Sequence, residues 1–284
     1  MALEFAKMHG LGNDFMVLDL VTQQYAVDAA QARAWADRRT GIGFDQLLLI
    51  EPPTRPDADF LFRIFNADGS EVQQCGNGAR CAAWYIAHRR LSPKPELVLD
   101  SLGGSLVTRL AGDDMVEVDM GEPRIEAAAV PLDSAADGLE PVSGLDATYA
   151  LQLDNATVQF TAVSMGNPHA VLRVDSVANA PVAELGPRLV GHRVFPEGAN
   201  IGFCEVVDRG FIRLRVFERG VGETQACGTG ACAAVVAASL LGAVGERVKV
   251  SLPGGKVRIR WQGPGSTVRM HGPATLVFEG RLQP

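Results

Sequence analysis

Apolar and polar residues alternate in short runs along most of the chain, and this pattern predicts many strands and few helices. The predicted strands cover residues 3–20 (two strands around a loop), 47–50, 60–66, 97–119, 149–163, 201–207, 212–217, 248–251, 256–261, 267–270 and 274–279. The predicted helices, with apolar residues at helical spacing, cover residues 28–39, 77–90, 182–189 and 231–241. Strands and helices in this order favour an α+β fold.

The second half of the chain repeats the loops of the first half in the same order. A Gly-Asn loop ends at Asn13 and again at Asn167, 154 residues later, and Cys227 follows Cys75 by 152 residues. A repeat this long predicts two similar domains related by a pseudo-twofold axis, with matching loops facing a cleft where ligands commonly bind. We predict one domain at residues 1–119, completed by the strand 275–284, and the other at residues 120–274.

The repeated feature of greatest chemical interest is a Cys-Gly-x-Gly motif, which begins at Cys75 and at Cys227 and runs into an Ala-rich helix. Unpaired N–H groups at a helix N-terminus attract anions and lower the pKa of a cysteine there. We therefore expect each motif to supply a thiolate beside a carboxylate site. The other cysteines (81, 204 and 232) lie in apolar runs without such glycines and are interpreted as structural.

Two such motifs facing one carbon would be suited to inverting a stereocentre. One thiolate would remove an α-proton, and the opposite thiol would deliver a proton to the other face. The backbone N–H groups of Gly76, Asn77, Gly228 and Thr229 would stabilise the charge that develops. No cofactor is needed for this chemistry.

Several other functional classes fit the sequence less well. None of the four lysines lies in a motif loop, which disfavours a pyridoxal-phosphate enzyme, and the cysteine spacing is not that of a metal site. The net charge of −7 disfavours a nucleic-acid partner. No signal peptide or membrane-spanning run is visible, so we expect a cytoplasmic protein with reduced thiols. A thiol–disulfide redox protein remains an alternative.

Eight short motifs together resemble the diaminopimelate epimerase family. They are residues 9–15 (HGLGNDF), 43–46 (GFDQ), 65–70 (FNADGS), 75–80 (CGNGAR), 166–169 (GNPH), 197–200 (EGAN), 218–220 (ERG) and 223–230 (ETQACGTG). The resemblance implies two domains, each a rolled, barrel-like mixed sheet around a central helix, with the active site in the interdomain cleft. It also implies cofactor-independent interconversion of LL- and meso-diaminopimelate, a precursor of lysine and peptidoglycan.

The resemblance also assigns roles to individual residues, with Cys75 and Cys227 as the catalytic pair. It implies that His169 and Glu218 tune the cysteines, and that Phe278 lies at a homodimer contact where the family often has tyrosine. The implied substrate-binding residues are Asn13, Gln46, Asn66, Gly76, Asn77, Asn167, Asn200, Glu218, Arg219, Gly228 and Thr229. Proline racemases and phenazine-type isomerases share this architecture. A proline or hydroxyproline racemase-like isomerase of the same fold remains an alternative, although the Asn-rich loops favour diaminopimelate.

Overall fold

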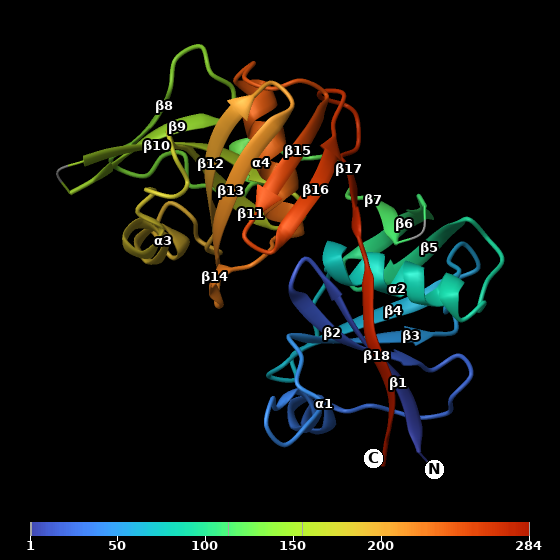
Figure 1. The fold of residues 1–284 in the computed structure, drawn as a ribbon. Coiled ribbons are helices and arrows are strands. Elements are labelled where there is room, and N and C mark those ends of the chain that lie inside the picture. The colour runs from blue at the N-terminus through green and yellow to red at the C-terminus, as the bar shows by residue number, and fades with distance from the viewer. Residues whose placement is uncertain (1, 113, 155, 284) are drawn as a thin grey trace. The chain divides into compact units, whose positions relative to one another are not determined.

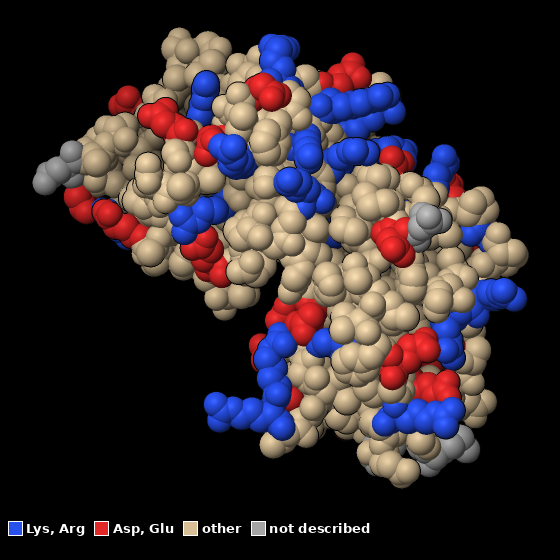
Figure 2. All heavy atoms as spheres, viewed as in Figure 1, with Lys and Arg blue, Asp and Glu red and all other residues tan. Residues whose placement is uncertain are grey.

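The computed structural model describes residues 2–112, 114–154 and 156–283, which form two compact units (Figure 1). The first unit consists of residues 1–119 and 271–284, and the second of residues 120–270. Among the described residues, no helix combines the length and the apolar character needed to cross a membrane. Side chains of both charge signs are visible on each unit in Figure 2.

The first unit is a mixed sheet that surrounds one helix. Its strands, in spatial order, are β18 (Thr275–Leu282), β1 (Leu3–Gly10), β2 (Asn13–Asp19), β3 (Gln46–Glu51), β4 (Phe60–Asn66), β5 (Glu96–Ser101), β6 (Gly104–Leu110) and β7 (Met115–Asp119). The pairs β2–β3 and β4–β5 are parallel, and the other neighbours are antiparallel. The helix α2 (Gly76–His88) touches β7 at one end of this order and β1, the second strand from the other end, so the sheet curves around it.

Strand alternation explains how a second helix covers the other side of this sheet. Side chains in a strand point alternately to its two faces. Leu47 and Leu49 pack with Ala32 and Ala36 of α1 (Ala29–Ala36), whereas Leu48 lies against the start of α2. Asp28 caps α1, because its carboxylate accepts a hydrogen bond from the Gln31 N–H at 2.8 Å.

The second unit repeats this arrangement around helix α4 (Gly228–Leu240). Its strands, in spatial order, are β8 (Leu139–Pro141), β9 (Thr148–Leu153), β10 (Ala156–Ser164), β11 (Pro168–Arg173), β12 (Asn200–Asp208), β13 (Phe211–Glu218), β15 (Arg247–Leu252) and β16 (Gly255–Arg260). The short β14 (Gly222–Thr224) pairs with β13, and β17 (Arg269–Pro273) leads back to the first unit. The remaining helices are α3 (Val182–Val190) and a 3₁₀ turn at Ala127–Ala129.

The register of the strands shows that the two units share one fold. Phe15 pairs with Gln46 between the parallel strands β2 and β3, and His169 pairs with Asn200 between β11 and β12. The helix α4 is buried on all sides of its central turns, which explains its uniform run of Ala and Val. The prediction of an α+β repeat, with a mixed sheet around a helix in each half, is therefore confirmed.

Two predicted loops are shorter than the sequence pattern indicated. The glycine-rich loop at residues 9–14 is a two-residue turn at Leu11 and Gly12, which both have positive φ, so Asn13 already belongs to β2. Strand β11 was not predicted, because it begins directly after the predicted Gly-Asn loop that ends at Asn167 and its first residue is a proline, which is typical of turns. His169 consequently lies in a buried strand.

Candidate active site

Cys75 and Cys227 occupy the same position in their units, immediately before the first turn of the central helix. Cys75 is the N-cap of α2, and its Sγ accepts a hydrogen bond from the Gly78 N–H at 3.3 Å. Cys227 is the N-cap of α4, and its Sγ lies 3.6 Å from Thr229 Oγ1. Each sulfur is therefore next to the N–H groups that the first turn of a helix leaves without helical partners.

The second glycine of each motif makes room for the sulfur. A Cβ on Gly78 would lie 3.5 Å from Cys75 Sγ and 3.0 Å from Leu48 Cδ2. A Cβ on Gly230 would lie 3.2 Å from Cys227 Sγ and 3.1 Å from a Val216 methyl group. These two glycines thus allow the helix start to pack on a strand without displacing the cysteine, a role that we did not foresee.

The predicted lowering of the thiol pKa is wrong for Cys227. Burial of the thiol, and after it the charge of Glu218, raises the pKa of Cys227 well above its ordinary value. Hydrogen bonds from Thr229 and from the Gly230 N–H act in the opposite direction and are outweighed. Burial also raises the pKa of Glu218, although the Thr224 hydroxyl donates to its carboxylate. Cys227 is accordingly held as a thiol, the form that can donate a proton.

In the second unit, His169 is connected to Cys227 through two other side chains. Its Nε2 lies 3.1 Å from Asn167 Oδ1, and Asn167 Nδ2 donates to Thr229 Oγ1 at 3.4 Å. Burial, together with the charge of Arg219, lowers the pKa of His169 to about 3. His169 is therefore neutral at physiological pH, and it orients Asn167 and Thr229 beside the sulfur.

Asn200 and Arg219 are joined through the backbone. Asn200 Oδ1 accepts a hydrogen bond from the Arg219 N–H at 2.9 Å, and the Arg219 guanidinium donates to the Glu197 carbonyl. Gly198 has a φ of +70°, and a Cβ there would lie 2.8 Å from Arg219 Cδ. The loop before β12 therefore packs against the side chain of the exposed Arg219 and accepts its hydrogen bond.

In the first unit, the predicted polar residues form two groups at neighbouring strand ends. Asn13 Oδ1 lies 3.9 Å from Cys75 Sγ and 3.4 Å from Asn77 Nδ2. Gln46 Nε2 donates to Asn66 Oδ1 at 3.0 Å. Among the described residues, no hydrogen-bond donor reaches the buried Gln46 Oε1. This oxygen can accept a hydrogen bond from a ligand.

Two charged residues that we did not predict as site residues also bind to the asparagines beside Cys75. Asp45 Oδ2 accepts a hydrogen bond from Asn13 Nδ2 at 3.0 Å, and Arg80 Nη2 donates to Asn77 Oδ1 at 2.9 Å. Both lie inside motifs that we had singled out, at 43–46 and 75–80. Each is the one charged residue in an otherwise neutral motif, and this feature of the sequence could have identified it.

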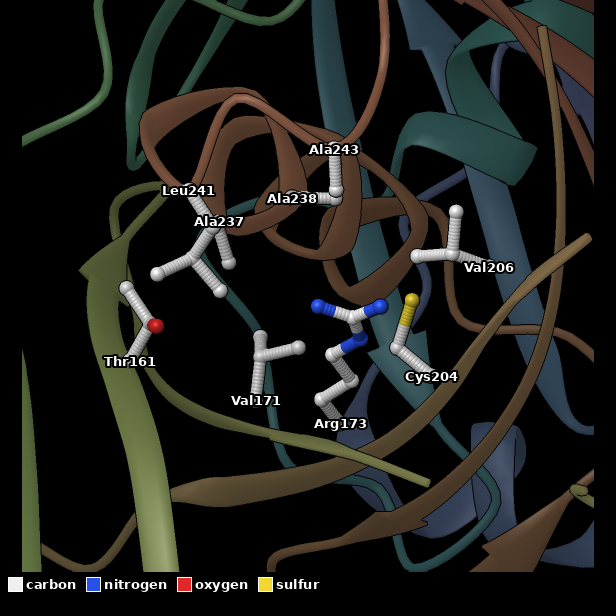
Figure 3. A pocket seen from close by; sticks show the side chains of 9 residues that line it. All are labelled: Thr161, Val171, Arg173, Cys204, Val206, Ala237, Ala238, Leu241 and Ala243. Atoms are coloured by element: carbon white, nitrogen blue, oxygen red, sulfur yellow. The ribbon is translucent and has the colours of Figure 1, made fainter. Parts of the chain in front are cut away.

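The remaining cysteines are in apolar surroundings. Burial raises the pKa of both Cys81 and Cys204 to about 12. Cys204 points into a small apolar cavity at the C-terminal end of α4, far along the helix from Cys227 (Figure 3). Within residues 2–112, 114–154 and 156–283, no three His, Cys, Asp or Glu side chains are grouped so that they could hold a metal ion.

Phe278 is an exposed apolar residue of β18. It is 48% exposed, and the preceding residue, Val277, is 55% exposed. The ring packs edge-on against Phe5 at a centroid distance of 6.0 Å. A large aromatic ring that is half exposed on a strand is available for a protein contact.

Comparisons with known proteins agree on one family. The family model described as "Diaminopimelate epimerase" matches residues 5–126 and 161–277. The diaminopimelate epimerases of Stutzerimonas stutzeri (strain A1501) and Pseudomonas aeruginosa (strain PAO1) are 53% and 52% identical to this chain over 283 residues, and the alignments cover 100% of both chains in each case.

Solved structures show the same fold at low sequence identity. A hydroxyproline epimerase from Agrobacterium vitis has a TM-score of 0.66 at 16% identity, covering 99% of this chain and 92% of that one. A phenazine biosynthesis protein from Bacillus anthracis has a TM-score of 0.67, also at 16% identity, covering 100% of both chains. The architecture is thus shared by proteins with different activities, and the fold alone does not select the substrate.

Proposed function

The chain belongs to the diaminopimelate epimerase family, and we propose that Cys75 and Cys227 are the acid–base pair with which it interconverts LL- and meso-diaminopimelate. The protein is an isomerase, as the full-length identity of 53% to a diaminopimelate epimerase indicates. The observation that carries the cysteine proposal is their duplication, since each caps the central helix of one unit. An epimerase needs one acid–base group on each face of the α-carbon.

In the proposed reaction, the cysteines exchange protonation states. One sulfur, as thiolate, takes the α-proton and breaks the C–H bond, leaving a carbanion whose charge spreads into the α-carboxylate. The other, as thiol, gives its proton to the opposite face of the carbon. The raised pKa of Cys227 favours the thiol form, so we propose that Cys227 enters as the donor and Cys75 as the base.

The start of each central helix supports the negative charge of the intermediate. We propose that the N–H groups of Gly76, Asn77, Gly228 and Thr229 donate to the α-carboxylate, since N–H groups in a first helical turn have no helical acceptor. Such donors stabilise the charge that develops as the proton leaves.

The other polar residues fit the rest of a substrate with two amino-acid ends. The buried Gln46 Oε1 needs a donor, and an ammonium group provides one. The exposed guanidinium of Arg219 can pair with a carboxylate. We propose that Glu218, through its backbone, and the side chains of Asn13, Asn66, Asn167 and Asn200 complete the binding set. Proline has one amino-acid end and would leave such groups unused, so the racemase alternative is not favoured.

We further propose that the enzyme is a homodimer in the cytoplasm. The exposed Val277 and Phe278 on β18 would form part of the contact between subunits. All five cysteines are thiols and none is in a disulfide among the described residues, which is compatible with a reducing compartment.

The proposed function is tested in deuterated water. The enzyme should convert LL-diaminopimelate to the meso isomer without added cofactor and place deuterium at the α-carbon. Cys75→Ser and Cys227→Ser should each lower kcat by about 10²-fold or more while the thermal unfolding midpoint stays near that of the wild type. Near-normal turnover in either variant would remove that cysteine from the pair, and a lack of deuterium exchange in the wild type would refute the reaction.

A further inference from the structure

Two amide side chains beside Cys75 are held between two opposite charges. At one end, Arg80 is fully buried and donates to Asn77 Oδ1 at 2.9 Å. In the middle, Asn77 Nδ2 donates to Asn13 Oδ1 at 3.4 Å. At the other end, Asn13 Nδ2 donates to Asp45 Oδ2 at 3.0 Å. These four residues form a continuous chain of hydrogen bonds, from a cation to an anion, within the first unit.

The charges at its ends fix the direction of this chain. A guanidinium can only donate hydrogen bonds, and a carboxylate can only accept them, whereas an amide has one donating and one accepting end. Arg80 therefore binds the oxygen of Asn77, and Asp45 binds the nitrogen of Asn13. The other ends of the two amides, Asn77 Nδ2 and Asn13 Oδ1, then meet as donor and acceptor. Turning either amide over would place two donors or two acceptors against each other.

Neighbouring ion pairs hold Asp45 in place. Its Oδ1 accepts from Arg38 Nη2 at 2.7 Å, and its Oδ2 also accepts from the Asp14 N–H at 3.2 Å. Arg38 binds both carboxylate oxygens of Asp14 as well, at 2.8 and 3.0 Å, and Lys7 contacts Asp14 from the other side. The carboxylate of Asp45 thus faces Asn13 although its side chain is 46% exposed.

We propose that Asp45 and Arg80 are positioning residues for the reaction, because together they turn the carbonyl oxygen of Asn13, rather than its NH₂ group, toward the sulfur of Cys75. Asn13 Oδ1 is 3.9 Å from Cys75 Sγ and can accept a hydrogen bond from its S–H. The S–H that forms when Cys75 takes the α-proton then has an acceptor. An NH₂ group in the same place would instead stabilise the thiolate and make it a weaker base.

The second unit lacks both charges. Ala199 stands where the repeat has Asp45, and Cys232 stands where it has Arg80. There, Asn167 presents its NH₂ group to Thr229, beside Cys227. Asn13 and Asn167 occupy corresponding positions, but Asn13 presents its oxygen near Cys75 whereas Asn167 presents its NH₂ group near Cys227. Cys227 also provides an internal control for any variant made in the first unit.

The inference rests on the proposed role of Cys75, but thiol alkylation tests it without turnover. In Asp45→Asn, Arg38 should hold the new amide oxygen, which leaves the NH₂ group facing Asn13. Asn13 then has no acceptor for its NH₂ group on this side. The turned-over orientation, which gives up the hydrogen bond from Asn77 and donates to Cys75 instead, is no longer excluded and becomes populated. We expect iodoacetamide to modify Cys75 several-fold faster at fixed pH, as measured by peptide mass mapping, with the rate at Cys227 unchanged. The value of kcat should fall by roughly tenfold, about the contribution of one hydrogen bond.

Two control variants separate hydrogen-bond direction from charge and from stability. Asp14→Asn removes the same charge from the same ion-pair cluster but leaves the Asp45 carboxylate beside Asn13, so Cys75 should react at its normal rate. Arg38→Gln breaks more ion pairs than Asp45→Asn, yet should lower kcat less. Equal acceleration of Cys75 alkylation in Asp14→Asn and Asp45→Asn, or no acceleration in the latter, would overturn the inference. A fall of kcat in Arg38→Gln as large as in Asp45→Asn would do so too.

Discussion

The buried, neutral His169 makes the stability of the second unit depend on pH, and His169→Phe should remove this dependence. Phe15 occupies the corresponding position of the first unit, where it is fully buried and pairs with Gln46 as His169 pairs with Asn200. The fold therefore accepts a phenylalanine at this place in the sheet. The substitution removes one titratable group and leaves the others unchanged.

The expected magnitude follows from the pKa of His169, which falls from 6.5 to about 3. As the pH drops below 6.5, the unfolded chain binds a proton at this residue and the folded chain does not, so the wild type loses stability until the pH reaches about 3. Each pH unit within that window corresponds to about 1.4 kcal/mol. The His169 contribution lost between pH 7.5 and pH 5 is thus about 2 kcal/mol.

Urea unfolding at these two pH values measures the effect. Trp261, buried in the second unit, can serve as the fluorescent reporter in a background where Trp35 and Trp84 of the first unit are phenylalanine. On going from pH 7.5 to pH 5, His169→Phe should lose about 2 kcal/mol less of its free energy of unfolding than the wild type. Parallel pH profiles for the two proteins would show that His169 takes up a proton in the folded state as easily as in the unfolded state.

Three other predictions concern the cysteine environment and the subunit contact. Glu218→Gln should lower the pKa of Cys227, because the carboxylate raises it, so alkylation of Cys227 should set in at lower pH; an unchanged profile would contradict the assigned cause. Gly230→Ala should cost about 1–3 kcal/mol in the free energy of unfolding and reduce turnover, because its Cβ would crowd Cys227 Sγ. Gly191→Ala, where a Cβ meets nothing within 4 Å, is its control and should change stability by less than about 0.5 kcal/mol. Phe278→Ser should shift the protein toward monomer in sedimentation equilibrium, and an unchanged mass would place the contact elsewhere.

The sequence was sufficient to predict the architecture because the evidence for it is local or repeated. Periodic apolar residues locate most strands and helices, and the recurrence of the motifs at Cys75 and Cys227 reveals the two halves. The resemblance to diaminopimelate epimerases, which rests on eight motifs, was confirmed by full-length relatives. Strand β11 was missed because it begins one residue after Asn167, within a run of turn residues.

The electrostatic details of the site could not be predicted, because they depend on residues far apart in the chain. A cysteine at a helix start suggests a thiolate, but the burial of Cys227 and its approach to Glu218 become apparent only in the folded unit. Similarly, Asp45 and Asn13 are separated by 32 residues, and hydrogen-bond direction is not encoded in either motif alone. The types of residue in a site can be matched to those of a family from the sequence. Their protonation states depend on how the residues pack, which only the structure shows.

The pairing of β18 with β1 has a consequence for how the chain folds during synthesis. The second unit is one continuous segment, residues 120–270, and can close as soon as that segment has left the ribosome. Synthesis of the first unit starts earlier, but its strand β1 pairs with residues 275–282, which follow the whole second unit in the sequence. Domains generally fold as units during translation. The β1 edge of the first unit must therefore stay unpaired until β18 has been synthesised, and the first unit is completed after the second.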